Sequence, residues 1–288
     1  MALLDLLTKA NQVYAVVHVN YHWRKSANND MHLVQHYCHV HHLKLFIKNI
    51  NPLIYQTSKI KNFEAWARKV RYNFFNLIGN LTNHHHLLMA HHLDDYLETA
   101  LMQLTKHRFL FHYGIPKHNQ IKHLIIDRPL LNKFSKENLI NYCHIHHISY
   151  GIDETNYDCK YFRNHVRSLL TKNENAKQQL LILIKQLNNA LASQYRKSLL
   201  YFHEWNKTNS VDYLLKLNLN YQFNLLKMYL YSHHINNLSQ NKLQGILGFL
   251  HSTLNQKSFR VAANTYLSKI NKNLFLIKDR VKSNKINK

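Results

Sequence analysis

One stretch in the first half of the chain constrains the fold more than any other. An apolar run at 87–90 is typical of a buried strand, and it stops at His91 and His92. Apolar residues then recur at helical spacing as far as Leu104, which predicts a helix that begins near residue 94. The first turns of this helix carry three carboxylates, Asp94, Asp95 and Glu98. These residues follow the carboxyl end of a strand, which is where open α/β sheets bind their ligands.

Acidic residues are scarce around this stretch. Residues 1–172 contain 21 Lys and Arg but only 11 Asp and Glu, and three of those 11 belong to the predicted helix start. The helix dipole favours carboxylates there, so we expect them to be ionised near neutral pH. A cationic chain that gathers its anions in one place is expected to use them on a cationic ligand.

The whole chain carries a formal net charge of +23, with 24 His besides. This charge indicates a polyanionic partner, and nucleic acid is the first candidate. The plainer alternative is an A/T-rich genome, which enriches Lys, Asn and Ile without any electrostatic role. Because Asp and Glu are not enriched alongside Lys, the electrostatic role is favoured.

Extended and helical patterns alternate through residues 1–172. Apolar, strand-like segments stand at 13–19, 45–50, 87–90, 124–131 and 148–152. Helical periodicity stands at 1–10, 31–41, 63–78, from 94 onward, and after a capping residue at Ser135. This alternation predicts an α/β fold with a doubly wound, mostly parallel sheet.

From residue 173 onward the chain is dominated by Leu, Lys, Asn, Gln and Tyr, with apolar residues at helical spacing. This part holds 17 Lys and Arg against 4 Asp and Glu, so it is the more basic part. We therefore predict an α/β domain at 1–172 and a smaller, mainly α-helical domain at 173–279 that faces nucleic acid, with a short strand near 275–277. Residues 280–288 are predicted to form a basic tail.

The three cysteines, at positions 38, 143 and 159, lie far apart and form no CxxC pair. Neither a zinc ribbon nor a dithiol site is therefore predicted. The N-terminus lacks the basic and apolar regions of a signal peptide, and no apolar stretch approaches the roughly 20 residues of a membrane span. We predict a cytoplasmic protein with no membrane partner, and the pattern indicates no particular oligomeric state.

Five motifs occur in a fixed order along the first part of the chain. They stand at 18–30, 67–75, 91–99, 127–131 and 153–167. Together they resemble the motifs of the tRNA(Ile)-lysidine synthases, which are members of the N-type ATP-pyrophosphatase (PP-loop) superfamily. The resemblance covers residues 1–170 and implies a PP-loop fold. The second part resembles the family only in its helical, basic character and not in sequence motifs.

Two departures from the family pattern stand out. The phosphate loop Ser-Gly-Gly-x-Asp-Ser is absent, and with it the first strand, which is central in such a sheet. We therefore expect Met1 to be an internal methionine of a natural protein that begins upstream. The second departure is the segment 106–113, which replaces a glycine-containing loop typical of the family.

The resemblance implies an ATP-dependent ligase that acts in two steps. The 2-oxo group of the wobble cytidine in the CAU anticodon of tRNA(Ile) attacks the α-phosphate of ATP, and pyrophosphate leaves. The ε-amine of free lysine then attacks C2 of the adenylated base, and AMP leaves, which forms lysidine. The first step is expected to use Mg²⁺ and positively charged groups around the triphosphate.

The resemblance also assigns roles to particular residues. Asp95 and Glu98, three apart on one helix face, are expected to hold the lysine. Asp94 is expected to face elsewhere, as a helix cap or a substrate contact. The remaining roles are catalysis for Arg71 and Arg167, nucleotide binding for His91, Arg128 and Arg163, and ordering of the substrate loop for Asn156 and Asp158. No metal-ligating residue is predicted.

Each assignment has a plainer alternative. The carboxylates at 94–98 could form a solvated helix cap, and Arg71 could belong to a solvated basic face. Arg163 and Arg167, four apart, could form a ridge that contacts only the RNA backbone. A zinc site at His91 and His92 is a more specific alternative, and it is less favoured.

Three other functions compete with the ligase. The first is a non-catalytic tRNA-binding relative that has lost its ATP loop. The second is a PP-loop tRNA thiolase, which usually uses paired cysteines that this chain lacks. The third is a histone-like nucleic-acid binder, which would have no use for the acidic helix start.

Overall fold

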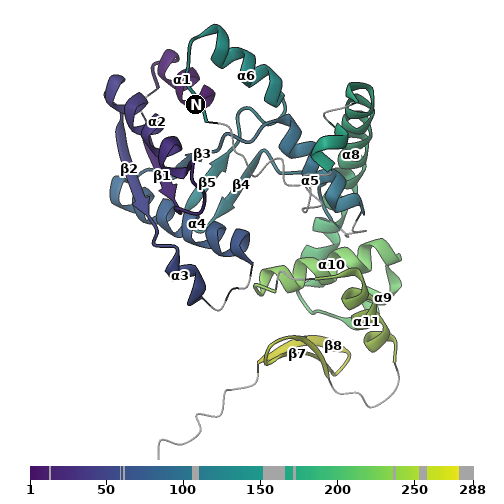
Figure 1. Cartoon of the computed structure of the whole chain (residues 1–288). Helices are drawn as coiled ribbons and strands as arrows, with labels where there is room; N and C mark the ends of the chain where they lie inside the picture. The colour runs from purple at the N-terminus through teal and green to yellow at the C-terminus, as the bar shows by residue number, and fades with distance from the viewer. Residues whose placement is uncertain are drawn as a thin grey trace, which may run out of the picture. The chain divides into compact units, whose positions relative to one another are not determined.

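The computed structural model describes residues 1–288 except 13, 59, 61, 106–109, 152–165, 171–172, 236–237, 253–257 and 279–288. The chain forms two compact units (Figure 1). The first comprises residues 1–102 and 114–181, and the second comprises residues 103–113 and 182–288. The predicted tail at 280–288 lies outside the described residues.

The first unit contains two groups of strands. β1 (Ala15–Asn20) and β2 (Lys44–Asn49) pair in parallel. In the other group, β5 (Leu124–Asp127) lies in the centre, parallel to β3 (His86–Leu88) and antiparallel to β4 (His118–Ile121). The expected mostly parallel α/β architecture is confirmed, and the antiparallel strand β4 was not predicted.

Six helices of this unit have described bounds. They are α1 (Ala2–Lys9), α2 (Ala27–Val40), α3 (Leu53–Gln56), α4 (Phe63–Thr82), α5 (Leu93–Thr105) and α6 (Lys136–Ile145). The last three residues of α5 belong to the second unit, and helix α8 (Glu174–Trp205) also begins in the first unit and continues into the second. The core of the first unit forms where aromatic residues on one face of α4 pack against β1, β2, β3 and β5.

A cavity of about 420 Å³ lies between the two groups of strands. Residues 15–18 of β1 and 86–88 of β3 line its sides, while α1 and α4 contribute residues such as Leu4 and Ile78. Among the described strands, β1 pairs only with β2 and β3 pairs only with β5, so both strands present an unpaired edge here.

The second unit is mainly helical. It contains α9 (Val211–Lys216), α10 (Leu219–Ser232), α11 (Gln240–His251) and an antiparallel sheet of β6 (Ser258–Ala262), β7 (Thr265–Ile270) and β8 (Asn273–Lys278). Its core is built around Trp205 and Leu226, which are almost fully buried. The predicted helical second part and the strand near 275–277 are both observed.

One predicted strand is wrong. Residues 148–151 form no strand, and residue 152 lies outside the described part. The backbone N–H of Ile148 instead donates to the carbonyl of Cys143, and His147 adopts a left-handed conformation, so this segment closes the end of α6. At the other end of α6 the predicted cap is confirmed, because Ser135 and Asn138 form a capping box.

Within the described residues, no helix is both long enough and apolar enough to cross a membrane.

Candidate active site

A cavity of about 660 Å³ opens at the carboxyl end of β1. Its walls come from the end of β1, the following turn, the start of α2, one face of α4 and His91, three residues beyond β3. The side chains relevant to chemistry are Tyr21, Trp23, Arg24, Asp30, Phe63, Arg68, Arg71 and His91. This volume falls within the range of about 300–1,000 Å³ that is typical of small-molecule sites.

Buried hydrogen bonds fix the turn that follows β1. The side chain of Asn20, only 2 % exposed, donates to Asn28 Oδ1 at 2.9 Å and accepts from the backbone N–H of His22 at 2.9 Å. The hydroxyl of Tyr21 donates to the carbonyl of Ala67 at 2.6 Å. Together these bonds attach the turn to α2 and α4, so the rim of the cavity is held in place before any ligand binds.

Positive charge gathers at the part of the cavity nearest β3. Arg71 Nε and His91 Nδ1 are buried and have no hydrogen-bond partner among the residues that the structure describes. The pKa of His91 is lowered to about 4, chiefly by burial; Asp95 acts to raise it, and nearby Arg128, Arg68 and Arg71 act to lower it. His91 is therefore neutral near pH 7, and its Nδ1 donates or accepts according to its tautomer. The unpartnered Arg71 Nε is a donor that suits an anionic ligand.

Arg128 is 3 % exposed, and residues of the segment 116–119 hold its side chain in place. Its Nη1 donates to the carbonyl of Pro116 at 2.7 Å and to Asn119 Oδ1 at 2.6 Å, which ties it to the segment containing β4. Its Nε is buried without a partner in the described part of the chain. Direct contact of Arg128 with a nucleotide stays a prediction.

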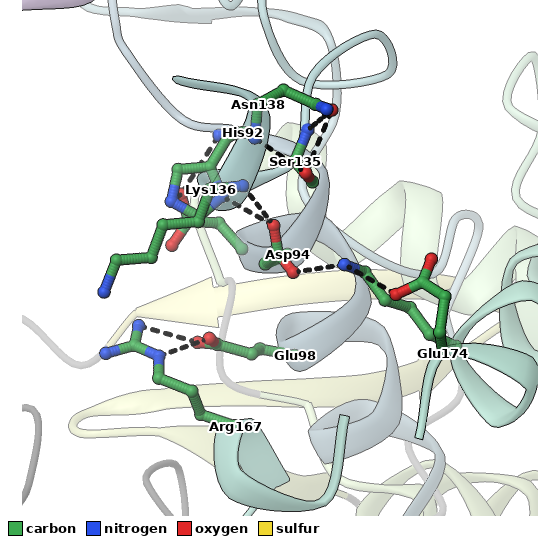
Figure 2. A network of polar contacts seen from close by, with 10 residues as sticks. His92, Asp94, Glu98, Ser135, Lys136, Asn138, Arg167 and Glu174 are labelled. Carbon is green, nitrogen blue, oxygen red and sulfur yellow. Dashed lines mark hydrogen bonds and ion pairs between the residues drawn. The ribbon is translucent and has the colours of Figure 1, made fainter. Parts of the chain in front are cut away.

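The acidic start of α5 is anchored on several sides. Asp95 Oδ2 accepts from the backbone N–H of His92 at 3.0 Å, so Asp95 caps its own helix. Asp94 instead accepts from the backbone N–H of Lys136 at 2.6 Å, at the first turn of α6, and pairs with Lys177 Nζ at 2.8 Å. Figure 2 shows Asp94 beside Lys136 and Glu98 facing Arg167.

These contacts determine the ionisation of Asp94. Burial acts to raise its pKa, but the bonds from His92, Lys177 and the Lys136 backbone hold the pKa well below its usual range. Asp94 is thus ionised near neutral pH, as expected. The capping role expected for Asp94 is directed at α6, whereas Asp95 caps α5, and a substrate contact by Asp94 stays a prediction.

Glu98 lies one turn further along α5 and is 1 % exposed. Arg167, in the helical segment 166–170, forms a two-pronged ion pair with it, with Nε at 2.6 Å from Oε1 and Nη2 at 3.1 Å from Oε2. The structure therefore brings together a carboxylate and a guanidinium that the sequence placed 69 residues apart. Asp95 and Glu98 are directed at different partners, and their joint role in holding lysine stays a prediction.

Three predicted site residues, Asn156, Asp158 and Arg163, lie outside the described residues. Two contributors to the site were missed. Lys177 belongs to a polar helix with nothing in its sequence neighbourhood to set it apart, so only the fold reveals it. Trp23 had a usable signal, because it is a large aromatic residue inside the otherwise polar segment 22–26.

In the part of the chain that the structure describes, no group of three or more His, Cys, Asp or Glu side chains could hold a metal ion. Cys38 and Cys143 are both free and buried.

Comparisons with known proteins place the chain among the PP-loop enzymes. Residues 1–174 match the family described as PP-loop domain. The tRNA(Ile)-lysidine synthase of Malacoplasma penetrans is 34 % identical over 282 residues, which cover 95 % of this chain and 93 % of that protein. The chain belongs to the tRNA(Ile)-lysidine synthase family.

A second member of the lysidine synthase family, from Mycoplasmopsis pulmonis, is 33 % identical over 280 residues and covers 96 % of each chain. The U34-tRNA thiolase NcsA of Methanococcus maripaludis, solved with its [4Fe-4S] cluster, matches with a TM-score of 0.52 at 16 % identity over 65 % of this chain and 67 % of that one. This likeness supports the PP-loop fold alone. Membership of this PP-loop family implies that the protein uses ATP.

Proposed function

We propose that the protein ligates free lysine to C2 of the wobble cytidine in the CAU anticodon of tRNA(Ile). The cytidine O2 attacks the α-phosphate of ATP, with release of pyrophosphate, and the lysine ε-amine then displaces AMP to give lysidine. The observation that carries this proposal is that two sites of opposite charge lie next to each other. A cavity with unpartnered cationic and polar donors ends at His91, and the carboxylate cluster of α5 begins three residues later.

The cavity fits the phosphates of ATP. Arg71 is the proposed catalytic cation because it lines the cavity and its buried Nε is unpartnered among the described residues. A guanidinium stabilises the charge that builds up on phosphate oxygens in the transition state. His91, neutral near pH 7, is the proposed polar contact to the nucleotide. Mg²⁺ would bind chiefly through the phosphates, since it usually needs only one or two protein carboxylates.

The Glu98–Arg167 pair fits a free amino acid. A zwitterion presents an ammonium and a carboxylate, and the pair presents the complementary carboxylate and guanidinium side by side. We propose that lysine binding exchanges part of this internal ion pair for contacts to the substrate. The ε-ammonium must also lose a proton before it attacks, and the carboxylate of Asp95 is the proposed acceptor.

The tRNA is proposed to contact the basic second part, residues 173–279. Lys and Arg there would neutralise backbone phosphates and contribute little sequence information. The target cytidine must leave the anticodon stack to reach a cavity in the first unit. We infer a cytoplasmic location from this substrate.

Labelled lysine, ATP and a tRNA(Ile) transcript with a CAU anticodon provide the test. We expect purified protein to transfer lysine to the tRNA and to release AMP and pyrophosphate in equal amounts. Asp95→Asn and Glu98→Ala should abolish transfer while tRNA binding is nearly unchanged. Glu137→Gln, which removes an exposed carboxylate on α6, is the matched control and should retain activity.

Two other outcomes would contradict the proposed reaction, and a third would contradict the role of Glu98. Tight tRNA binding with neither adenylation nor lysine transfer would favour the non-catalytic relative. Sulfur transfer to the tRNA in the presence of a sulfide donor would favour a thiolase. Loss of tRNA binding in Glu98→Ala to the same extent as loss of lysine transfer would make Glu98 a structural residue.

A further inference from the structure

Trp23 is the exposed member of the three tryptophans in the chain. Its side chain is 53 % exposed, whereas Trp66 is 5 % exposed and Trp205 is 1 % exposed. One face of the Trp23 ring stacks on Phe63, with centroids 4.2 Å apart and ring planes 19° apart, and its edge meets Tyr55 at 5.7 Å. A large aromatic ring that is held rigidly and left half exposed is typical of a binding surface.

Trp23 lies in the same cavity as the basic residues of α4. Trp23, Tyr21 and Phe63 line the 660 Å³ cavity that also contains the cationic wall. Phe63 and Arg71 are eight residues apart on α4, which corresponds to about 12 Å along the helix axis. Along α4, the Trp23–Phe63 stack therefore lies at one end of the cavity and Arg71 lies about two turns further along. The guanidinium of Arg24, next to Trp23, is paired with Asp30 at 2.6 Å.

A nucleoside triphosphate has the same polarity, with a flat base at one end and phosphates at the other. We propose that Trp23 is the stacking platform for the adenine ring of ATP, which rests on the function proposed above. Phe63 supports the ring from behind, and the bonds of Asn20 fix the turn that carries it. The platform is thus formed before ATP binds, so little ordering is needed on binding.

An unstacked base of the tRNA presents a similar face and is the competing occupant. Adenine is favoured because Trp23 shares one cavity with Arg71 Nε and His91 Nδ1, the buried atoms that lack partners among the described residues. A ligand that stacks on Trp23 and carries its phosphates into the same cavity satisfies both ends. An RNA base inserted at Trp23 would leave these two atoms to a separate ligand.

The test compares binding of ATP with binding of tripolyphosphate, which carries the same charge pattern without a base. Calorimetric titrations of the full chain should show that Trp23→Ala binds ATP between about 5-fold and 100-fold more weakly, as expected for the loss of one base–aromatic stack. Binding of tripolyphosphate should be unchanged, and Trp23→Phe should recover most of the ATP affinity. Phe275→Ala, which removes an aromatic ring 42 % exposed on β8, is the control and should bind ATP like the unaltered protein.

Tryptophan fluorescence provides a second readout, because Trp23 dominates the fraction that acrylamide can reach. ATP should protect Trp23 from acrylamide, and tripolyphosphate should not. If Trp23→Ala binds ATP as tightly as the unaltered protein, the inference is wrong and the proposed ligase function still stands. If tRNA protects Trp23 and ATP does not, the platform belongs to an RNA base and the inference is likewise wrong. If the unaltered protein binds no ATP at all, the proposed function fails together with the inference.

Discussion

Removing the guanidinium of Arg167 should destabilise the first unit more than removing the charge of its partner. Glu98 is 1 % exposed, so Arg167→Ala leaves a buried carboxylate without its two-pronged partner. Breaking a buried ion pair from one side costs about 3–5 kcal/mol of unfolding free energy. Because the Arg167 side chain is itself 22 % exposed, solvent reaches the vacated space, and we expect a loss near the lower limit, about 3 kcal/mol.

The reverse change should cost less. Glu98→Gln keeps the shape of the side chain and one acceptor oxygen, and it leaves a guanidinium that is already partly solvated. We expect a loss of about 1 kcal/mol, which is typical for weakening one hydrogen-bonded contact. The double variant Arg167→Ala/Glu98→Gln removes both charges of this pair, so the loss should be about 2 kcal/mol rather than the sum of the two single losses.

Urea unfolding followed by far-UV circular dichroism would measure these differences in all four proteins. For a unit of this size, a loss of about 3 kcal/mol corresponds to a decrease in melting temperature of roughly 6–12 °C. Additive single losses, with no coupling between the two positions, would refute the argument, because they would show that the pair gains nothing from the burial of Glu98. Equal losses for the two single variants would refute the asymmetry between a buried and a partly solvated charge.

Three further predictions concern other parts of the first unit. The pKa of His91 is about 4 in the folded protein and about 6.5 in the unfolded chain, so the unfolded chain binds more protons between these pH values. The free energy of unfolding should therefore be highest above pH 6.5 and fall by up to about 3 kcal/mol as the pH drops to 4. Urea unfolding across this pH range should show a shallower fall in His91→Gln. Gly114→Ala should lower the free energy of unfolding in urea by about 2–4 kcal/mol, because Gly114 has a φ of +84° and a Cβ there would clash with the Tyr96 ring. Unchanged stability would show that the ring can move aside. Lys177→Ala should lower the free energy of unfolding by about 1–3 kcal/mol, because it removes a charged partner of Asp94. Lys177→Arg should restore much of this loss. If neither variant changes the melting temperature, Lys177 belongs to a solvated surface.

The sequence by itself determined the local elements, because periodicity and capping act over short distances. Short apolar runs predicted the strands β1, β2, β3 and β5, and apolar residues at helical spacing predicted the main helices. The cap at Ser135 was visible because one side chain and a backbone N–H three residues away form it. The error at 148–151 arose where a short apolar segment closes a helix, since an apolar run of that length does not distinguish a strand from a helix end.

The sequence also determined which chemistry gathers at the end of β3, because the charges at 91–98 are adjacent in the chain. The partner of each charge was decided only by the tertiary structure. Glu98 meets Arg167 from 69 residues away, and Asp94 meets Lys177 and the first turn of α6. Local patterns carry no record of such pairings, since a buried charge selects its partner by geometry after the elements pack. The same packing formed the cavity that Trp23 and Arg71 share, because its walls come from β1, α2, α4 and the segment after β3, which are far apart in the sequence.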